Sequence, residues 1–315
     1  MVNTNQGKRP SQNNGRPGIK ISLLEARKWA ISELTTAGFE IEEATDNVDF
    51  LLTGALNVNY GMLRANLSRQ MHPWLAERWP TWIAGLLKSV PAQYLLGQAP
   101  FYGEEFYVDD RVLIPRPETE LLVEWILSDL KNEAAANHHE LGPTVLDIGT
   151  GSGAIILTLA KQWPNLRGIG ADLSQDALVV AQKNRDKFDL AGRVGLVESD
   201  LFTALEGQRF DVIVSNPPYI RPDAQSEMDV SVQTYEPEMA LYADDNGLAL
   251  YKQMAQGLAD HLNPGGGAYF EIGYDQGPAL VAVFQAALPD ADVTLKQDLA
   301  GLDRMIQVRL KNENN

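Results

Sequence analysis

The chain contains no cysteine among its 315 residues. Disulfide bonds and thiolate zinc sites are therefore excluded, and a reducing compartment such as the cytoplasm is the simplest setting. The histidines show no metal-ligand spacing with carboxylates, so we expect a cytoplasmic protein without a metal site. The four histidines are His72, His138, His139 and His261.

Long apolar runs and clusters of positive charge are also missing. No run approaches the length of a membrane span, so we expect no membrane segment. The net charge is −16, and no stripe of Lys and Arg is present that could track phosphates. This balance disfavours DNA as a substrate and fits a basic protein partner better.

The first 90 residues divide into two segments by composition and periodicity. Residues 1–18 are polar and lack the apolar core of a secretory signal, and we predict a disordered tail there. Residues 19–90 predict a small all-helical N-terminal domain. Ser22 and Glu25 have the spacing of a capping box, and Gly38 suits the end of the first helix.

Residues 91–117 predict a β-hairpin that links two domains. The stretch FYGEEFYVDDRVLIP alternates apolar with polar residues, and its VDDR portion, residues 108–111, is the expected turn. A helix is then expected to begin at Pro117 and Glu118, because proline and an acidic residue both suit a first helical turn.

Residues 118–315 predict an α/β domain. Short apolar strands alternate with helical patterns, and FDVIVS has the near-continuous apolar character of a strand buried on both faces. This alternation indicates a doubly wound, mostly parallel sheet with helices on both sides. Within it, NPGG (residues 263–266) is expected to form a turn before the strand GAYFEIG.

The ends of the first two strands of this domain carry ligand-suited groups. Ligands of such sheets bind beyond the carboxyl ends of the strands. The glycines of DIGTGSG let the backbone approach a ligand, and Asp172 suits ribose hydroxyls, with helix capping as its alternative role. A nicotinamide-dependent dehydrogenase would show the same two features. The loop positions are Gly149, Thr150, Gly151, Ser152 and Gly153.

The next two strand ends favour methyl transfer. SDLF supplies Asp200 for an adenine amino group and Leu201 to cover the ring, and NPPY follows the fourth strand as residues 216–219. A dehydrogenase gives no role to Asn216. A methyltransferase accounts for all four strand ends.

The motif order DIGTGSG, AD, SDLF and NPPY resembles the methyltransferases that use S-adenosylmethionine. Residues 91–124, with PRPETE, and residues 235–251, with YEPEMAL and NGLALY, are similar to the protein-(glutamine-N5) methyltransferases of peptide chain release factors. The resemblance implies a seven-stranded, Rossmann-like catalytic domain, S-adenosylmethionine as cofactor, and substrate recognition by the helical domain. A serine-containing run in place of PRPETE would instead indicate the relatives that modify a ribosomal-protein glutamine.

The same resemblance implies a cofactor site. The glycine loop would hold the methionine part, Asp172 the ribose and Leu201 the adenine, with Asp200 and Asn216 beside them. Two departures are present: Leu201 stands where some relatives have an aromatic residue, and DDNGL replaces the usual Asp-Gly-Leu. Three residues of PRPETE are expected to line the same pocket, namely Arg116, Glu118 and Thr119, although the run also suits a plain helix start.

The NPPY residues suit a flat, poorly nucleophilic amide. Its two N–H groups need two acceptors, which the Asn216 side chain and the Pro217 carbonyl provide. Pro217 and Pro218 stiffen the backbone and carry no competing N–H. Tyr219 can lie against the amide plane. We therefore assign catalysis to Asn216, Pro217 and Tyr219, and substrate binding to all four residues.

The sequence thus predicts a monomeric enzyme that methylates the glutamine of the Gly-Gly-Gln motif in release factors. The alternatives are an adenine-N6 nucleic-acid methyltransferase, a ribosomal-protein glutamine methyltransferase, and a nucleotide-binding module without catalysis. The missing basic groove disfavours the first alternative, and an intact NPPY motif disfavours the last.

Overall fold

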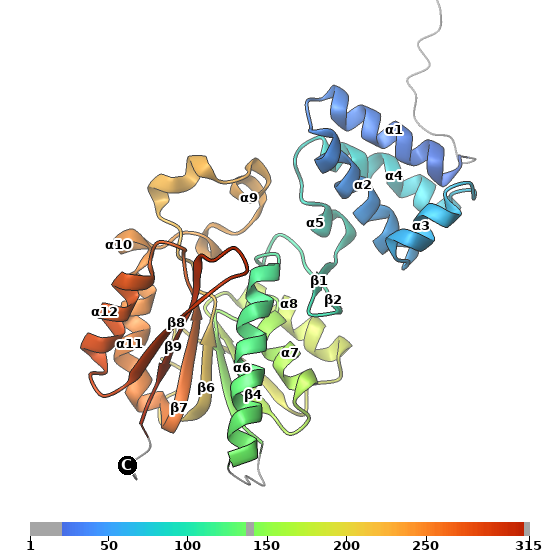
Figure 1. Ribbon diagram of the computed structural model, residues 1–315. Coiled ribbons are helices and arrows are strands. Elements are labelled where there is room, and N and C mark those ends of the chain that lie inside the picture. Colours follow the sequence, from blue (N-terminus) through green and yellow to red (C-terminus); the bar gives the residue numbers. More distant parts are fainter. Residues whose placement is uncertain (1–20, 137–141, 312–315) are drawn as a thin grey trace, which may run out of the picture. The chain divides into compact units, whose positions relative to one another are not determined.

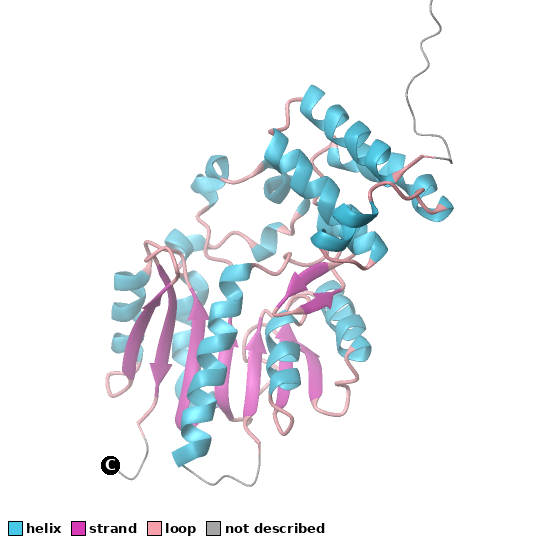
Figure 2. Cartoon of the chain, turned by 45° about the vertical axis from the view of Figure 1, so that its right-hand side comes forward, coloured by secondary structure: helices cyan, strands magenta, loops and turns pink. Residues whose placement is uncertain are grey.

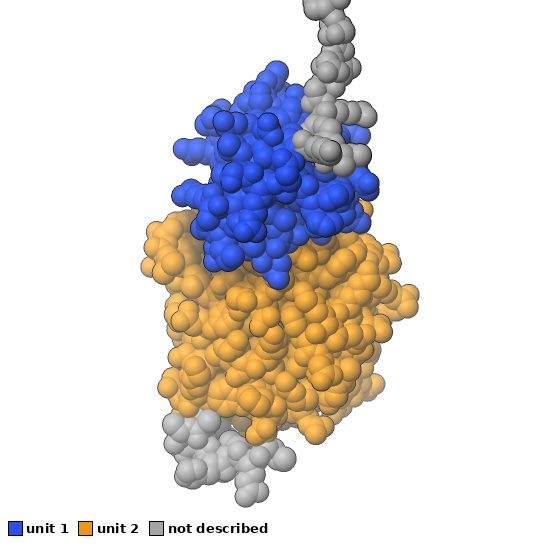
Figure 3. Space-filling view, turned by 90° about the vertical axis from the view of Figure 1, so that its right-hand side faces the viewer, with its two compact units in different colours: residues 1–96 blue, residues 97–315 orange. Residues whose placement is uncertain are grey.

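The computed structural model describes residues 21–136 and 142–311. These residues fall into two compact units that divide between Leu96 and Gly97 (Figure 3). The predicted tail at residues 1–18 and the two histidines His138 and His139 lie outside the described residues.

The first unit is helical over its described residues. Ser22 Oγ accepts a hydrogen bond from the Glu25 amide at 3.2 Å, and Glu25 Oε2 accepts one from the Ser22 amide at 2.9 Å, so the predicted capping box is confirmed. Fully buried Leu52 and Trp79 lie in its apolar core. The helices are α1 (Leu23–Thr36), α2 (Ile41–Leu56), α3 (Tyr60–Asn66), α4 (Pro73–Leu86) and α5 (Ala92–Leu96); α3 and α5 are not anticipated by the sequence pattern.

The second unit opens with a short hairpin of β1 (Ala99–Phe101) and β2 (Glu104–Phe106). The expectation of its turn at VDDR is wrong, because the strands are joined by Tyr102 and Gly103, whose φ angles are 49° and 76°. Two successive positive φ angles are typical of a type I′ hairpin turn, and glycine adopts them without strain. VDDR instead forms a separate turn after the hairpin, stabilised by Asp109 bonds to Arg111.

The main sheet of this unit has seven strands in the order β5-β4-β3-β6-β7-β9-β8. Figure 1 labels most of these strands. Strands β3 to β7 run parallel, and β9 is antiparallel to both of its neighbours. The predicted doubly wound fold is therefore confirmed. The strands are β3 (Thr144–Ile148), β4 (Arg167–Asp172), β5 (Val194–Glu198), β6 (Phe210–Ser215), β7 (Leu262–Glu271), β8 (Asp292–Gln297) and β9 (Asp303–Arg309).

Helices cover both faces of the sheet (Figure 2). Alternate residues of each central strand point to opposite faces, so Val145 packs with α6 and α7 whereas Leu146 packs with α11 and α12. The helices of this unit are α6 (Pro117–Ala136), α7 (Ala154–Gln162), α8 (Gln175–Lys187), α9 (Val230–Tyr235), α10 (Asp244–Gly247), α11 (Ala249–His261) and α12 (Gly277–Ala287). Ser174 Oγ accepts a bond from the Ala177 amide, which confirms the predicted N-cap of α8.

The expected turn at NPGG lies instead inside β7. Phe210 of β6 pairs with Leu262, and Val212 pairs with Gly267, so residues 263–266 form a bulge between two paired positions. Gly265 has a φ of 77°, which suits glycine. The chain therefore leaves the ladder for these residues without ending the strand.

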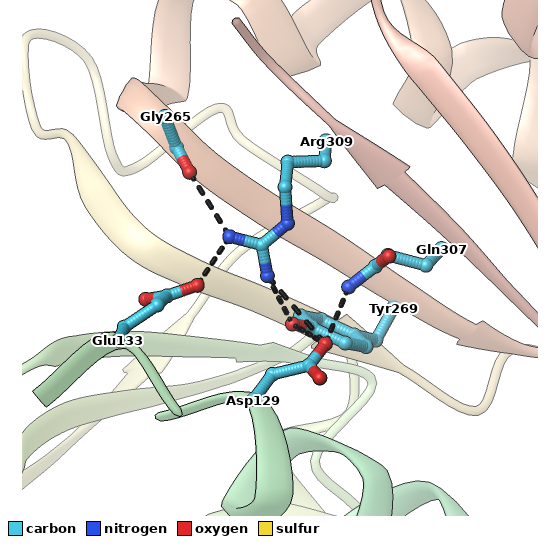
Figure 4. A network of polar contacts seen from close by, with 6 residues as sticks. All are labelled: Asp129, Glu133, Gly265, Tyr269, Gln307 and Arg309. Carbon is cyan, nitrogen blue, oxygen red and sulfur yellow. Dashed lines mark hydrogen bonds and ion pairs between the residues drawn. The ribbon is translucent and has the colours of Figure 1, made fainter. Parts of the chain in front are cut away.

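A polar cluster holds α6 against the sheet (Figure 4). Asp129 Oδ2 accepts hydrogen bonds from the Tyr269 hydroxyl at 2.9 Å and from Gln307 Nε2 at 2.7 Å. The Arg309 guanidinium donates to the Tyr269 hydroxyl at 2.9 Å and pairs with Glu133. Two carboxylates of α6 are thus fixed to β7 and β9, which steadies the helix whose first turn reaches the candidate site.

Candidate active site

A cavity, here termed the glycine-loop cavity, lies at the carboxyl ends of β3, β4, β5 and β6. It brings together most of the site residues expected from the sequence, although those residues come from five separate segments of the chain. The predicted residues among its lining are Arg116, Thr119, Gly149, Thr150, Gly151, Ser152, Asp172, Asp200, Leu201, Asn216, Pro217 and Pro218.

A second cavity, termed the tyrosine cavity, shares the NPPY corner with the first. Asn216, Pro217 and Pro218 line both cavities, and Tyr219 lines only this one. The NPPY motif therefore forms the wall between two adjoining spaces. The other lining residues of the tyrosine cavity include Leu113, Arg116, Met228, Val232 and Glu271.

The glycine loop exposes its backbone to the first cavity. Gly149, Gly151 and Gly153 have φ angles of 71°, 55° and 81°. Open space of at least 4 Å stands where a Cβ of Gly149 would be, whereas a Cβ of Gly153 would meet Leu157 Cδ1 at 2.8 Å. The first glycine thus leaves room for a ligand, and Gly153 is required by packing against α7, outside the cavity lining.

Asp172 is held in place by the loops around it. Its Oδ2 accepts a bond from the Gly151 amide and its Oδ1 one from the Ser174 amide, both at 2.8 Å. Burial raises the pKa of this carboxyl above its ordinary value. Each oxygen of a carboxylate can accept a further hydrogen bond, so Asp172 can both order the two loops and receive ribose hydroxyls.

Asp147, which the sequence analysis does not single out as a site residue, lies beneath the loop. It is fully buried, its Oδ2 accepts a bond from the Thr150 hydroxyl at 2.7 Å, and its Oδ1 has no partner in the described structure. Burial raises the pKa of Asp147 to about 7. A run of TVLDIG places an aspartate inside a buried strand, and that position is the sequence signal for it.

The remaining wall is apolar and suits a flat base. Leu173 is 57% exposed although it lines the cavity, and Leu201 lines it together with Leu250 and Met254 of α11. Leu201 has a φ of 50° and its carbonyl accepts a bond from the Ser199 hydroxyl at 2.8 Å. Open backbone, a ribose-suited carboxylate and an apolar wall together fit an adenosyl sulfonium ligand.

The NPPY corner keeps its key acceptors free. Asn216 Nδ2 donates to Thr119 Oγ1 at 3.2 Å, and the Tyr219 carbonyl accepts a bond from Gln276 Nε2 at 3.1 Å. Across the described residues, neither Asn216 Oδ1 nor the Pro217 carbonyl accepts a hydrogen bond. These two oxygens are available to a group that carries two N–H donors.

Glu271, the second carboxylate that sequence reasoning does not identify, stands behind this corner. It is 2% exposed, and its Oε2 accepts a bond from the Thr119 hydroxyl at 2.6 Å. The Tyr219 hydroxyl approaches its Oε1 at 3.5 Å. Burial raises the pKa of Glu271 to about 7, and burial with the nearby carboxylate raises the pKa of Tyr219 to about 12. The only sequence signal is a glutamate inside the apolar strand AYFEIG.

The other PRPETE residues divide in role. Arg116 Nη2 pairs with Glu236 Oε1 at 2.6 Å, and Glu236 Oε2 accepts a bond from the Ile114 amide at 3.3 Å, so the segment from residue 235 is tied to the cavity rim. Glu118 is exposed and does not line either cavity. The structure therefore places Glu118 outside the cofactor pocket in which the sequence analysis expected it.

Among the described residues, no group of three or more His, Asp or Glu side chains has the arrangement to hold a metal ion. In the same part of the chain, no helix combines the length and apolar character needed to cross a membrane.

Comparisons with known proteins identify the family. Residues 120–235 match the model of the methyltransferase small domain, and residues 25–97 match that of the PrmC N-terminal domain. The release factor glutamine methyltransferase of Streptococcus pneumoniae is 46% identical over 218 residues, which cover 69% of this chain and 74% of the relative. That of Cereibacter sphaeroides is 37% identical over 286 residues, or 91% of this chain and 98% of the relative.

Among solved structures, the hMettl16 catalytic domain superimposes with a TM-score of 0.51 at 14% identity, over 78% of this chain and 86% of that chain. This likeness concerns the fold alone. Both sequence relatives carry the same name, and one of them spans nearly the whole chain. The chain belongs to the family of release factor glutamine methyltransferases.

Proposed function

We propose that the protein transfers a methyl group from S-adenosylmethionine to the side-chain amide nitrogen, N5, of the glutamine in the Gly-Gly-Gln motif of peptide chain release factors. The observation that carries this proposal is the pair of free oxygens at the NPPY corner, on Asn216 and Pro217, between two adjoining cavities. A primary amide offers two N–H donors in one plane and is the group that such a pair of acceptors suits.

The glycine-loop cavity is the proposed cofactor site. Gly149 and Gly151 leave the backbone open, Asp172 receives ribose hydroxyls, and Leu173 with Leu201 cover the base. When bound there, S-adenosylmethionine supplies an activated methyl group on a sulfonium. The protein contributes placement of the two reacting groups, which is worth about 7–11 kcal/mol in favourable intramolecular cases.

The NPPY corner is proposed to hold the glutamine amide from the side of the tyrosine cavity. Its amide hydrogens become more acidic as the nitrogen lone pair is drawn away, so the bonds to Asn216 Oδ1 and the Pro217 carbonyl strengthen during the reaction. Such interactions stabilise the transition state more than the bound substrate. The Tyr219 ring lies in the same cavity and can pack on the amide plane. The methylated nitrogen releases its proton to water.

The chain's acidic charge and its helical unit support the proposed partner. A net charge of −16 favours a basic protein surface over phosphates. We assign residues 19–90 to substrate recognition, residues 91–117 to the linker and residues 118–315 to catalysis. In this proposal the enzyme acts as a monomer in the cytoplasm, where release factors function.

One assay tests the function. The protein is incubated with labelled S-adenosylmethionine and, in separate reactions, a release factor, its Gly-Gly-Gln glutamine-to-alanine variant, a ribosomal protein and duplex DNA. We expect label on the intact release factor alone. Label on the ribosomal protein or on DNA in its place would contradict the proposal, and so would label on the alanine variant.

A further inference from the structure

Two buried side chains, Thr119 and Glu271, form a hydrogen-bonded chain with the half-buried Asn216 of the NPPY corner. Thr119 Oγ1 donates to Glu271 Oε2 at 2.6 Å, and Asn216 Nδ2 donates to Thr119 Oγ1 at 3.2 Å. Glu271 ends β7 and Asn216 follows β6, and their preceding residues Phe270 and Ser215 are register partners. The two functional groups therefore leave neighbouring parallel strands at the same level, with Thr119 of α6 between them.

The direction of these bonds is determined by the number of hydrogens available. A threonine hydroxyl has one hydrogen, and the short contact to a carboxylate, an acceptor without hydrogens when ionised, uses it. The Thr119 oxygen can then only accept. The group of Asn216 that faces it must be the NH2, because a carbonyl oxygen at 3.2 Å would place two acceptors against each other.

We propose that Glu271 is a positioning residue that, through Thr119, turns the Asn216 amide so that its Oδ1 faces the reacting amide. This inference rests on the proposed function, since it names what sets the acceptor geometry of that site. In this role Glu271 acts through Thr119 and not by a contact of its own with the reacting amide. It selects one of two amide orientations of nearly equal shape, and only one of them presents an acceptor.

A second contact supports the same role for this carboxylate. The Tyr219 hydroxyl lies 3.5 Å from Glu271 Oε1, a long and weak contact on the oxygen that Thr119 leaves free. Two polar side chains of the NPPY motif are thus linked to the same carboxylate, Asn216 through Thr119 and Tyr219 directly. Gln276 fixes the Tyr219 backbone independently, by a bond to its carbonyl at 3.1 Å.

This hydrogen-bonded chain from Glu271 through Thr119 to Asn216, here termed the relay, depends on the ionised form of Glu271. Charged and titratable groups face it from each packed element: Glu118 from α6, Arg304 from β9, Tyr219 after β6, and Tyr251 of α11, whose hydroxyl donates to the Glu271 carbonyl at 2.6 Å. Burial outweighs the attraction of Arg304, and the pKa of Glu271 lies at about 7. When protonated, Glu271 can donate a hydrogen bond to Thr119. The Thr119 hydroxyl hydrogen then no longer has to point at Glu271, and the Asn216 side-chain amide can flip. Turnover should therefore fall as the pH falls through this range.

Three variants and one matched control test the relay by kinetics. Thr119→Val removes the hydroxyl at nearly constant shape, Thr119→Ser restores it, and Glu271→Gln removes the obligatory acceptor. Thr158→Val is the control, because Thr158 of α7 is equally buried, outside both cavities, and its hydroxyl has no partner in the described structure. We expect kcat to fall about 10- to 100-fold in Thr119→Val and Glu271→Gln. The dissociation constant for S-adenosylmethionine should stay near that of the wild type in Glu271→Gln, because Glu271 does not line the glycine-loop cavity. Thr119→Ser should recover most of the kcat lost in Thr119→Val.

The pH profile and a spectroscopic signal separate positioning from general damage. In the wild type, kcat should decline as pH falls through about 7, and Glu271→Gln should be low and flat there. The side-chain amide signals of Asn216, assigned by their loss in Asn216→Ala, should titrate with Glu271 in the wild type and in Thr158→Val, but not in Glu271→Gln.

Wild-type kcat and an unchanged pH profile in Glu271→Gln would overturn the relay, and so would Asn216 signals that titrate equally in that variant. The amide signals require no methyl acceptor. If the wild type fails to label a release factor, the proposed function fails while the relay is still decided by the spectra.

Discussion

Gly247 lies directly against the main chain of Tyr219. A Cβ at Gly247 would stand 2.1 Å from the Tyr219 carbonyl oxygen and 2.5 Å from Gln276 Nε2, and the φ of Gly247 is 78°. Any side chain at this position must therefore push the NPPY corner out of place. The departure DDNGL has its own geometry here, since Asp245 and Asn246 also have positive φ angles of 56° and the Asn246 carbonyl accepts a bond from Gln276 at 3.2 Å.

Gly247→Ala should lower kcat for release factor methylation by about 10²-fold, the cost of displacing a catalytic group by about 1 Å. Binding of S-adenosylmethionine, measured by calorimetry, should change little, because the nearest atoms to an added Cβ belong to Tyr219 and Gln276 and not to the glycine loop. Gly192→Ala is the matched control, since no atom lies within 4 Å of its added Cβ. Normal turnover in Gly247→Ala would mean that the corner tolerates movement.

Asn216→Ala removes the proposed side-chain acceptor while leaving Pro217 in place. We expect kcat to fall by about 10²–10³-fold, as for the loss of one transition-state hydrogen bond. The dissociation constant for S-adenosylmethionine should rise only a few-fold by comparison. Asn263→Ala, which removes a bond to Asp211 away from both cavities, serves as the control. Equal loss of turnover and of cofactor affinity would contradict the role given to Asn216.

Asp172→Asn should act on cofactor binding instead. The variant cannot accept from both the Gly151 and the Ser174 amides in addition to ribose hydroxyls, because one of its two groups is now a donor. A hydrogen bond to a charged group contributes about 1.5–3 kcal/mol, so affinity for S-adenosylmethionine should fall at least about tenfold in a calorimetric titration. Asp176→Asn, exposed in the first turn of α8, should bind normally. Wild-type affinity in Asp172→Asn would remove this residue from the site.

Asp147 should make the protein less stable as the pH rises. Its pKa is raised by burial from 3.8 to about 7, so the native state keeps a proton that the unfolded chain releases between these values. The free energy of unfolding therefore falls across this window, by up to about 4 kcal/mol at its upper end. Asp147→Asn carries no such proton. Urea denaturation between pH 5.5 and 8 should show the variant gaining stability over the wild type as the pH rises. A constant difference would mean that Asp147 is ionised throughout.

The elements that the sequence predicts well are those whose signals are local. Apolar runs specify the central strands, and the caps at Ser22 and Ser174 depend on neighbours three residues away. The position of the glycine loop and NPPY at one sheet edge follows from the parallel order of the strands, which sequence alternation already indicates.

The elements that it misses depend on contacts between distant residues. The hairpin turn falls at Tyr102–Gly103 because a strand register, and not turn propensity alone, selects between two plausible turns. Glu271 and Asp147 read as ordinary acids until burial reveals them. Gly247 reads as a loop glycine, and only the fold places it against Tyr219, which lies 28 residues earlier in the chain.

The place of β9 in the sheet has a consequence for biosynthesis. β9 stands between β7 and β8 in space although it follows both in the chain. During synthesis, β8 emerges with no strand to pair with, and β7 keeps an open edge until residues 303–309 arrive. Arg309 on that strand also anchors Glu133 of α6. Premature arrest of the ribosome upstream of β9 therefore leaves a nascent chain with exposed strand edges, a state prone to aggregation and suited to capture by chaperones.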